Sequence, residues 1–236
     1  MNLLKPVLWN LEADRRRGWR HLTKVLSGLT ADMQEPLVFV IQRCEAASPG
    51  LHQCLVDALP PSERARLQAY RRTEDQQRFL LARGALRQLL GLVLGVSPTL
   101  PVLTLGPHGR PFCADGPEFS ISHSGEMVTL AVHATLAVGV DVEAPRDDLD
   151  WAPIARRMFD AAEIAEIESL PEPLRPAEFR VRWCRLEAEL KAGGWGIGAA
   201  PPRASRAGRF RHWALDVSAL AGTFPDYRGS VACALR

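Results

Sequence analysis

The sequence predicts an α+β fold in which two similar subdomains each combine helices with an antiparallel sheet. Two observations support this prediction. Along the chain, the hydrophobic pattern follows the order strand, helices, strands, helices and strands, and such runs of elements are typical of α+β proteins. Both halves also place helices before strands of antiparallel type, which favours a duplicated plan.

Length and composition are those of a globular protein. The chain has 236 residues, of which 47% are hydrophobic and 24% are charged, and these values exclude a disordered chain, a collagen-like fibre and a coiled-coil rod. Lys plus Arg number 29 and Asp plus Glu number 27, so the formal net charge is +2. A strong basic excess is missing, which argues against a dedicated nucleic-acid-binding protein.

Several features indicate a soluble, cytoplasmic protein. The longest apolar run, residues 89–96, is too short to span a bilayer, and the N-terminus does not have the pattern of a secretory signal peptide. The five cysteines are scattered and contain no CxxC pair. A disulfide framework or a zinc site is therefore not expected, and a reducing compartment is favoured.

The first third of the chain contains one predicted strand and two predicted helices. Residues 1–35 have only a weak pattern and are expected to form an N-terminal extension. Residues 36–42 (PLVFVIQ) form a nearly continuous apolar run, which is typical of a buried strand. Ser62 follows two prolines and is the expected N-cap of a helix, while Thr73 with Gln76 matches a capping box at a second helix start.

The second predicted helix carries apolar residues at helical spacing and is expected to end at Gly95. From residue 102 onward the pattern indicates strands, with turns near Gly125 and Ala134. The remaining elements are expected to be helices over 150–170 and 176–192, a surface loop over 193–208, and strands over 212–217 and 229–235.

The segment AVGVDVEAP, residues 137–145, places two carboxylates on one face of a strand. Alternate residues of a strand share a face, so Asp141 and Glu143 lie on the side opposite three valines. Two neighbouring carboxylates repel each other unless a cation lies between them, and Mg²⁺ prefers such oxygen ligands. The alternative is an amphipathic strand with a solvated acidic face, which is a common pattern.

The segment WCRLEAELKAGGWGI, residues 183–197, places Glu187 and Lys191 on one helix face, because they are spaced i, i+4. Glu187 could complete a metal site or act as a general base toward a hydroxyl, and Lys191 could neutralise a phosphate. The alternative is a surface ion pair that stabilises the helix by about 0.2–0.5 kcal/mol.

The segment FSISHSG, residues 119–125, contains Ser122 and His123 just before a glycine turn. The histidine could contact a phosphate, although a lone histidine at a strand end is more often structural. Motifs of serine hydrolases (GxSxG) and zinc proteases (HExxH) are missing here.

Arginines are concentrated in the early helices and in the HGRPF turn. Arginine is the preferred side chain for phosphate oxygens, and one or two of these residues are expected to touch a ligand. The set comprises Arg71, Arg72, Arg78, Arg83, Arg87 and Arg110. The P-loop and GxGxxG fingerprints are missing from the sequence, which disfavours a Walker-type kinase and a Rossmann dehydrogenase.

Five motifs occur in one order along the chain, namely HGRPF, FSISHSG, GVDVE, RRMFDAAE and WCRLEAELKAGGWGI. This series resembles the 4′-phosphopantetheinyl transferase superfamily, in its larger, pseudo-dimeric class of the surfactin-synthetase-activating type. The resemblance covers residues 36–236. It implies two similar subdomains, 36–125 and 126–236, related by a pseudo-twofold axis within a monomer.

The resemblance also implies a reaction: transfer of the 4′-phosphopantetheine arm of coenzyme A to a serine of an acyl or peptidyl carrier protein, with release of adenosine 3′,5′-bisphosphate. By motif position, Asp141, Glu143 and Glu187 match carboxylates that bind Mg²⁺, with Mn²⁺ as the alternative ion. Glu187 is the expected general base, and Lys191 matches a lysine that contacts the phosphate.

Further positions match the family's contacts to coenzyme A. Ser122 and His123 match phosphate contacts of the FNISHSG motif, and Arg78 and Arg110 match basic positions around the nucleotide. The implied partners are coenzyme A and the carrier protein, with neither a nucleic acid nor a membrane among them.

Three positions depart from the family pattern. Ser120 replaces the usual Asn, Arg110 replaces the usual Lys, and Leu186 stands where the family commonly has Lys. The loss of a cation before Glu187 leaves open a second class of function, a coenzyme A or carrier-protein binding module that has lost catalysis. A different phosphotransferase is a third alternative. All three carboxylates are retained, which favours an active enzyme.

Overall fold

Short strands with apolar residues on one or both faces form the centre of the fold. A computed structural model describes residues 2–43, 48–146, 148–216 and 226–235. One sheet, here called sheet N, has the strand order β2 (Val7–Leu8), β3 (Leu37–Gln42), β7 (Met127–His133) and β6 (Glu118–Ser124). The other, sheet C, has the order β1 (Asn2–Leu4), β9 (Phe210–Leu215), β10 (Arg228–Ala234) and β8 (Val138–Glu143). A separate hairpin pairs β4 (Thr104–Leu105) with β5 (Pro111–Phe112).

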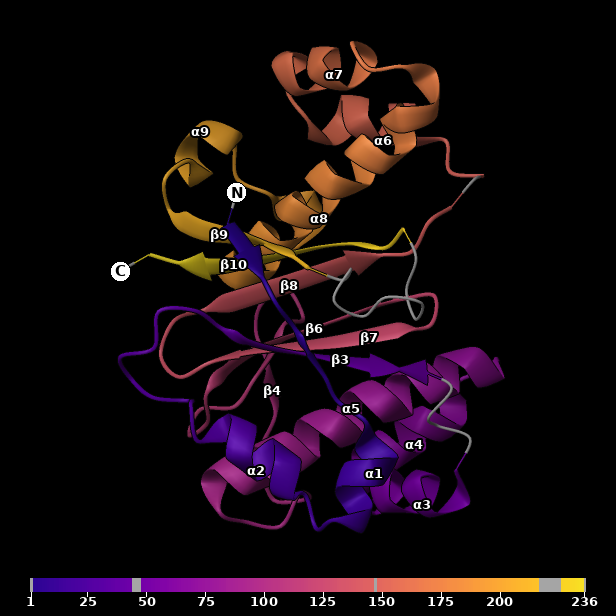
Figure 1. The fold of residues 1–236 in the computed structure, drawn as a ribbon, viewed down its shortest axis with the longest axis vertical. Coiled ribbons are helices and arrows are strands. Elements are labelled where there is room, and N and C mark those ends of the chain that lie inside the picture. Colours follow the sequence, from indigo (N-terminus) through magenta and orange to yellow (C-terminus); the bar gives the residue numbers. More distant parts are fainter. Residues whose placement is uncertain (1, 44–47, 147, 217–225, 236) are drawn as a thin grey trace.

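The helices lie outside the two sheets. Sheet N is covered by α1 (Leu11–Arg16), α2 (Arg20–Leu26), α3 (Pro49–Asp57), α4 (Pro61–Ala69) and α5 (Thr73–Leu94). On the side of sheet C lie α6 (Trp151–Met158), α7 (Ala161–Glu168), α8 (Arg175–Gly193) and the short α9 (Arg203–Arg206). The layers follow the order helices, sheet N, sheet C, helices (Figure 1). The α+β class is thereby confirmed, with mainly antiparallel pairing in both sheets.

Alternation along β8 produces the core between the two sheets. Val138, Val140 and Val142 pack against Val38 and Val40 of β3, so this face of sheet C is apolar. The residues between the valines point to the other side, as strand geometry requires. β7 is buried along its whole length, because helices cover one face of sheet N and sheet C covers the other. The predicted boundary at residue 125 falls within the β6–β7 hairpin, both strands of which belong to sheet N.

Gly139 allows α8 to lie directly on β8. A Cβ atom at this position would lie 2.5 Å from the backbone nitrogen of Ala192 and would overlap the carbonyl oxygen of Ala188. Only glycine therefore permits this close approach of backbone to backbone. The contact fixes the height of α8 over the strand and brings its polar face beside the carboxylates of β8.

The helix boundaries differ from the sequence predictions in three places. α4 begins at Pro61, with Pro60 as its N-cap, because proline is preorganised for the first helical position. The predicted cap Ser62 lies inside the helix. α5 begins at Thr73 without a side-chain cap, so the expected capping box is not formed. The helix predicted over 150–170 is divided at Asp160, which forms a capping box at the start of α7.

The stretch expected to be an N-terminal extension is built into both sheets. β1 pairs in parallel with β9 of sheet C, and β2 pairs in parallel with β3 of sheet N, so one continuous segment passes from one sheet to the other (Figure 1). Asp14 holds the following turn: its buried carboxylate accepts hydrogen bonds from Trp9 Nε1 at 3.1 Å and from the backbone N–H groups of His21 and Leu22 at 2.8 and 3.0 Å. In the described ranges, no helix is both long enough and apolar enough to cross a membrane.

Candidate active site

A cleft of about 450 Å³ lies where β6 and β8, one edge strand from each sheet, come together. Its walls come from α4, α5 and the β5 strand on one side and from β8 and α8 on the other. The lining residues are Arg66, Tyr70, Asp75, Arg78, Phe79, Ala82, Arg83, Pro111, Ile121, Ser122, His123, Asp141, Val142, Glu143, Glu187 and Lys191. The cleft thus brings together all of the predicted site residues except Arg110.

Asp141 lies at the base of the cleft and is only 2% exposed. Its Oδ1 atom accepts hydrogen bonds from Ser122 Oγ at 2.8 Å and from Lys191 Nζ at 2.7 Å. Among the described residues, no N–H or O–H donor reaches its Oδ2 atom, while the buried thiol of Cys184, a weak donor, interacts with the same carboxylate. A buried carboxylate oxygen without an N–H or O–H donor is costly, and a bound cation would satisfy it.

The other two carboxylates have raised pKa values. Burial and the charge of Asp141 raise the pKa of Glu143 above its usual value. Burial, followed by the charge of Asp141, raises the pKa of Glu187 to about 7, although Lys191 acts in the opposite direction. Both shifts have one physical cause: negative groups share a poorly solvated site that lacks enough positive charge.

Lys191 supplies the positive charge between Asp141 and Glu187. Its Nζ atom lies 2.7 Å from Asp141 Oδ1 and 3.5 Å from Glu187 Oε2. Burial works to lower the pKa of Lys191, but the two carboxylates outweigh it and the pKa is raised. Within the described ranges, no three acidic, His or Cys side chains are arranged so that together they could hold a metal ion. The residues still fit a hard divalent ion, because the donors are carboxylate oxygens and Asp141 Oδ2 has no N–H or O–H partner.

Basic side chains of α4 and α5 form the opposite wall. Arg78 is held by Asp75, with Nη1 to Oδ1 at 2.7 Å. Arg83 is poorly solvated: burial lowers the pKa of its guanidinium, and its Nη1 atom is one of the buried nitrogens without a hydrogen-bond partner in the described structure. An anion in the cleft would relieve this deficit.

Sequence reasoning missed Arg66, and it did not select Arg83 from the other helix arginines. A signal for Arg83 was present. The residues of α5 that line the cleft are Asp75, Arg78, Phe79, Ala82 and Arg83, which follow the i, i+3, i+4, i+7, i+8 spacing of one helix face. Counted from Asp75, this spacing includes Arg78 and Arg83 but not Arg87, and Arg71 and Arg72 lie before α5 begins.

Ser122 and His123 both lie in the cleft but differ in their surroundings. The Ser122 hydroxyl is engaged within the protein, since it donates to Asp141 and accepts from Lys191 Nζ at 3.1 Å. His123 lies toward the opening, where burial and the nearby charges of Arg78 and Lys191 lower the pKa of its imidazole. Their predicted contacts with coenzyme A phosphates stay predictions.

Arg110 and Leu186 do not line the cleft. The guanidinium of Arg110 donates to Glu118 Oε2 at 2.9 Å and to the carbonyl oxygens of Phe119, Val138 and Ala192 at 3.3 Å. It therefore ties β6, β8 and α8 together. Leu186 is buried on another face of α8, in a groove with Met158, Phe159 and Phe210. Leu186, which stands where the family commonly has Lys, is thus separated from the carboxylates by the helix itself.

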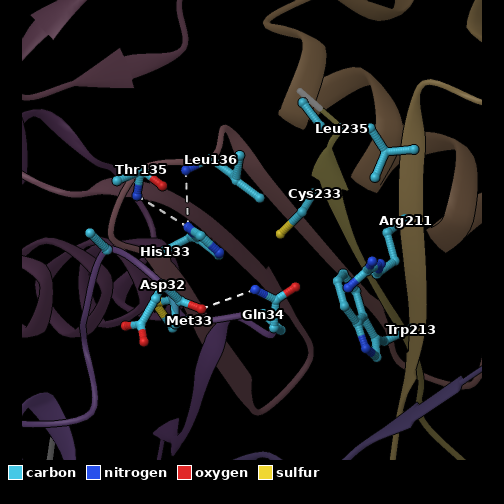
Figure 2. A pocket seen from close by; sticks show the side chains of 12 residues that line it. Asp32, Met33, Gln34, His133, Thr135, Leu136, Arg211, Trp213, Cys233 and Leu235 are labelled. Carbon is cyan, nitrogen blue, oxygen red and sulfur yellow. Dashed lines mark hydrogen bonds between the residues drawn. The ribbon is translucent and has the colours of Figure 1, made fainter.

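A second cavity, of about 270 Å³, lies beside β9 and the ends of β7 and β10. Figure 2 shows it between the loop of residues 31–34 and the side chains of Arg211 and Trp213. His133 Nδ1 accepts the backbone N–H groups of Thr135 and Leu136 at 3.1 and 2.9 Å, which shapes the turn at its edge. Asp32 is the acidic residue among its lining residues, so this cavity does not repeat the carboxylate cluster.

Comparison with known proteins identifies the family of part of the chain. The family model described as the 4′-phosphopantetheinyl transferase superfamily matches residues 137–221. This range contains the acidic strand β8 and the helix α8, and therefore Asp141, Glu143, Glu187 and Lys191.

Individual relatives extend the match. A protein of Synechocystis sp., whose name assigns it to the 4′-phosphopantetheinyl transferases, is 32% identical over 169 residues, which cover 70% of this chain and 67% of the relative. The 4′-phosphopantetheinyl transferase HetI of Nostoc sp. is 35% identical over 150 residues, covering 61% and 63%. The 4′-phosphopantetheinyl transferase psf-1 of Bacillus pumilus is 31% identical over 137 residues, covering 57% and 58%. The matches thus span about two thirds of the first relative and somewhat less of the other two.

Proposed function

The chain belongs to the 4′-phosphopantetheinyl transferase superfamily, a family of enzymes, and we propose that it transfers the 4′-phosphopantetheine group of coenzyme A to a serine of an acyl or peptidyl carrier protein. The serine oxygen bonds to the phosphorus that carries the pantetheine arm. The bond from this phosphorus to the 5′-phosphate of the nucleotide breaks, and adenosine 3′,5′-bisphosphate leaves. The observation that carries the proposal is the cleft itself, in which three carboxylates and Lys191 face a wall of arginines.

The arginine wall is suited to the phosphates of coenzyme A. Arg66, Arg78 and Arg83 line one side of the cleft, and arginine binds phosphate oxygens through its fork of N–H groups. The unpartnered Nη1 of Arg83 supports this role. We assign to Lys191 a contact with the diphosphate, where an ammonium stabilises charge on the leaving oxygen.

Asp141, Glu143 and Glu187 are the residues that would hold Mg²⁺, or Mn²⁺ in its place. When bound, such an ion would neutralise charge on the diphosphate oxygens. The orphaned Asp141 Oδ2 and the raised pKa values of the two glutamates support this assignment, because a cation relieves both.

Glu187 is the proposed general base. The assignment rests on the place of its carboxylate in the cleft, beside Lys191. The pKa of about 7 that burial and Asp141 give Glu187 belongs to the metal-free protein, and a bound cation would lower it. Its carboxylate would accept the proton of the carrier serine as the new oxygen–phosphorus bond forms. The i, i+4 spacing places Lys191 one helical turn away, so the base and the phosphate contact come from one rigid element.

The proposal is tested by incubating the protein with coenzyme A, Mg²⁺ and an apo carrier protein, and by weighing the intact carrier. We expect a mass gain equal to one phosphopantetheine and an equal amount of adenosine 3′,5′-bisphosphate. A carrier whose acceptor serine is replaced by alanine is the control and should gain no mass.

The other outcomes separate the alternatives. Binding of coenzyme A without a mass gain on the carrier would contradict the enzyme and favour a binding module. Release of inorganic phosphate or AMP would indicate a different phosphotransferase. The position of Leu186 outside the cleft removes the main reason to expect lost catalysis.

A further inference from the structure

The junction between β6 and β8 contains a repeating contact made by serine side chains. Ser120, Ser122 and Ser124 lie two residues apart on β6, so their side chains point to the same side of the strand. Their hydroxyls accept hydrogen bonds from the backbone N–H groups of Val140, Val142 and Ala144, respectively, at 3.1, 3.4 and 3.0 Å. The hydroxyls thus serve as the acceptors that the backbone of a neighbouring strand would supply within one sheet.

Two of the three serines also hold a carboxylate. Ser122 Oγ donates to Asp141 Oδ1 at 2.8 Å, and Ser124 Oγ donates to Glu143 Oε2 at 3.1 Å. The residue that stands in the same relation to Ser120 is Gly139, which has no side chain. Ser120 therefore joins the strands in the same way as the other two but holds no carboxylate on β8.

We propose that Ser122 and Ser124 are positioning residues that hold the carboxylates of Asp141 and Glu143 in the orientation required to bind a divalent cation. A serine fixed to the β8 backbone cannot turn away without losing that bond, so the carboxylate it donates to is fixed as well. Ser122 is bound most firmly, since it also accepts from Lys191 Nζ. The identity of the cation rests on the proposed function, whereas the positioning contacts do not.

The consequence is a measurable loss of cation affinity. Residues that hydrogen-bond to metal ligands change affinity by about 10–100-fold when they are removed. Ser124 is the better test, because its replacement leaves Lys191 and Asp141 undisturbed. We therefore expect Ser124→Ala to weaken Mn²⁺ binding by about tenfold or more, and Ser124→Thr, which keeps the hydroxyl, to restore most of the affinity.

Ser120→Ala is the matched control. It removes a hydrogen bond of the same type between the same two strands, so it should lower the melting temperature about as much as Ser124→Ala does. Mn²⁺ affinity, measured from the electron paramagnetic resonance signal of the free ion with and without coenzyme A, should stay within about twofold of wild type in this control, because no positioning contact is lost.

The outcomes distinguish this proposal from the proposed function. Equal Mn²⁺ affinity in Ser120→Ala and Ser124→Ala would overturn the positioning role, as would a wild-type protein that takes up no Mn²⁺ under either condition. The predicted affinity pattern in a protein that transfers nothing to a carrier would refute the transferase proposal but would support the positioning role.

Discussion

Besides the apolar core packed between them, the two sheets are joined at two of their edges, and these joints are made in different ways. At one, the segment containing β1 and β2 pairs with the edge of each sheet through backbone hydrogen bonds and is followed by the fully buried Trp9. At the other, β6 and β8 meet through the serine hydroxyls, and the cleft opens beside them. We call the first the closed joint, because backbone pairing joins the sheets there. We call the second the open joint, because the side chains that join the sheets there leave room for charged groups. The proposed chemistry therefore lies where the sheets are joined by side chains.

The largest effect is expected at Glu187 on the open joint. Glu187→Gln removes the proposed base but keeps the size of the side chain, so we expect the transfer rate to fall by about 10²–10⁴-fold, the usual contribution of general acid–base catalysis. The measurement is the initial rate of carrier modification together with the melting temperature. An unchanged rate in a folded variant would remove the base assignment.

The next largest effect is expected where α8 lies against Gly139 of β8, beside the open joint. Gly139→Ala would place a methyl group against the backbone of α8, and overpacking of this kind costs about 1–3 kcal/mol or more. We expect a clear loss in the free energy of unfolding, measured with urea, and a loss of transfer because Glu187 and Lys191 move. Gly198→Ala is the control, since its added Cβ would meet no atom within 4 Å. Equal stability of both variants would show that α8 does not depend on this contact.

A substitution at the closed joint should lower the stability of the protein without changing its catalytic rate. Asp14→Ala leaves Trp9 Nε1 and two backbone N–H groups without their acceptor, and a buried polar group left unsatisfied costs about 1–3 kcal/mol. We expect that loss in the free energy of unfolding, with kcat unchanged under conditions in which the variant is folded. A large drop in kcat at full folding would mean that the two joints are not functionally distinct.

The smallest effect is a shift in titration at the open joint. In the metal-free protein, the carboxyl carbon of Glu187 should titrate with a pKa of about 7 when followed by NMR. Added Mg²⁺ should lower this pKa, because a nearby cation favours the ionised form. A pKa that Mg²⁺ leaves unchanged would argue against Glu187 as a metal ligand.

The open joint could be predicted from the sequence better than the closed one. Asp141 and Glu143 share a face through strand alternation, and Glu187 and Lys191 share one through helical spacing, so local geometry was enough to pair them. Their meeting in one cleft depends on Gly139, whose role is visible only when α8 is seen lying on it.

The closed joint could not be predicted because its strands are too short to have a pattern. β1 and β2 have three and two residues, and their pairing with β9 and β3 involves residues far along the chain. Leu186 shows a related limit. It is adjacent to Glu187 in sequence, but neighbouring residues of a helix point to different faces. The effect of a leucine at this position could therefore be judged only once the orientation of α8 was known.

The most direct test compares one carboxylate from each of the two cavities. Asp141→Ala and Asp32→Ala are assayed beside wild type by the intact mass of an apo carrier after incubation with coenzyme A and Mg²⁺. We predict that Asp32→Ala modifies the carrier at the wild-type rate. The rate of Asp141→Ala should fall by at least about 10²-fold, as for the loss of a main electrostatic group of an active site. Wild-type transfer by a folded Asp141→Ala protein would contradict the conclusion that the junction of β6 and β8 is the active site.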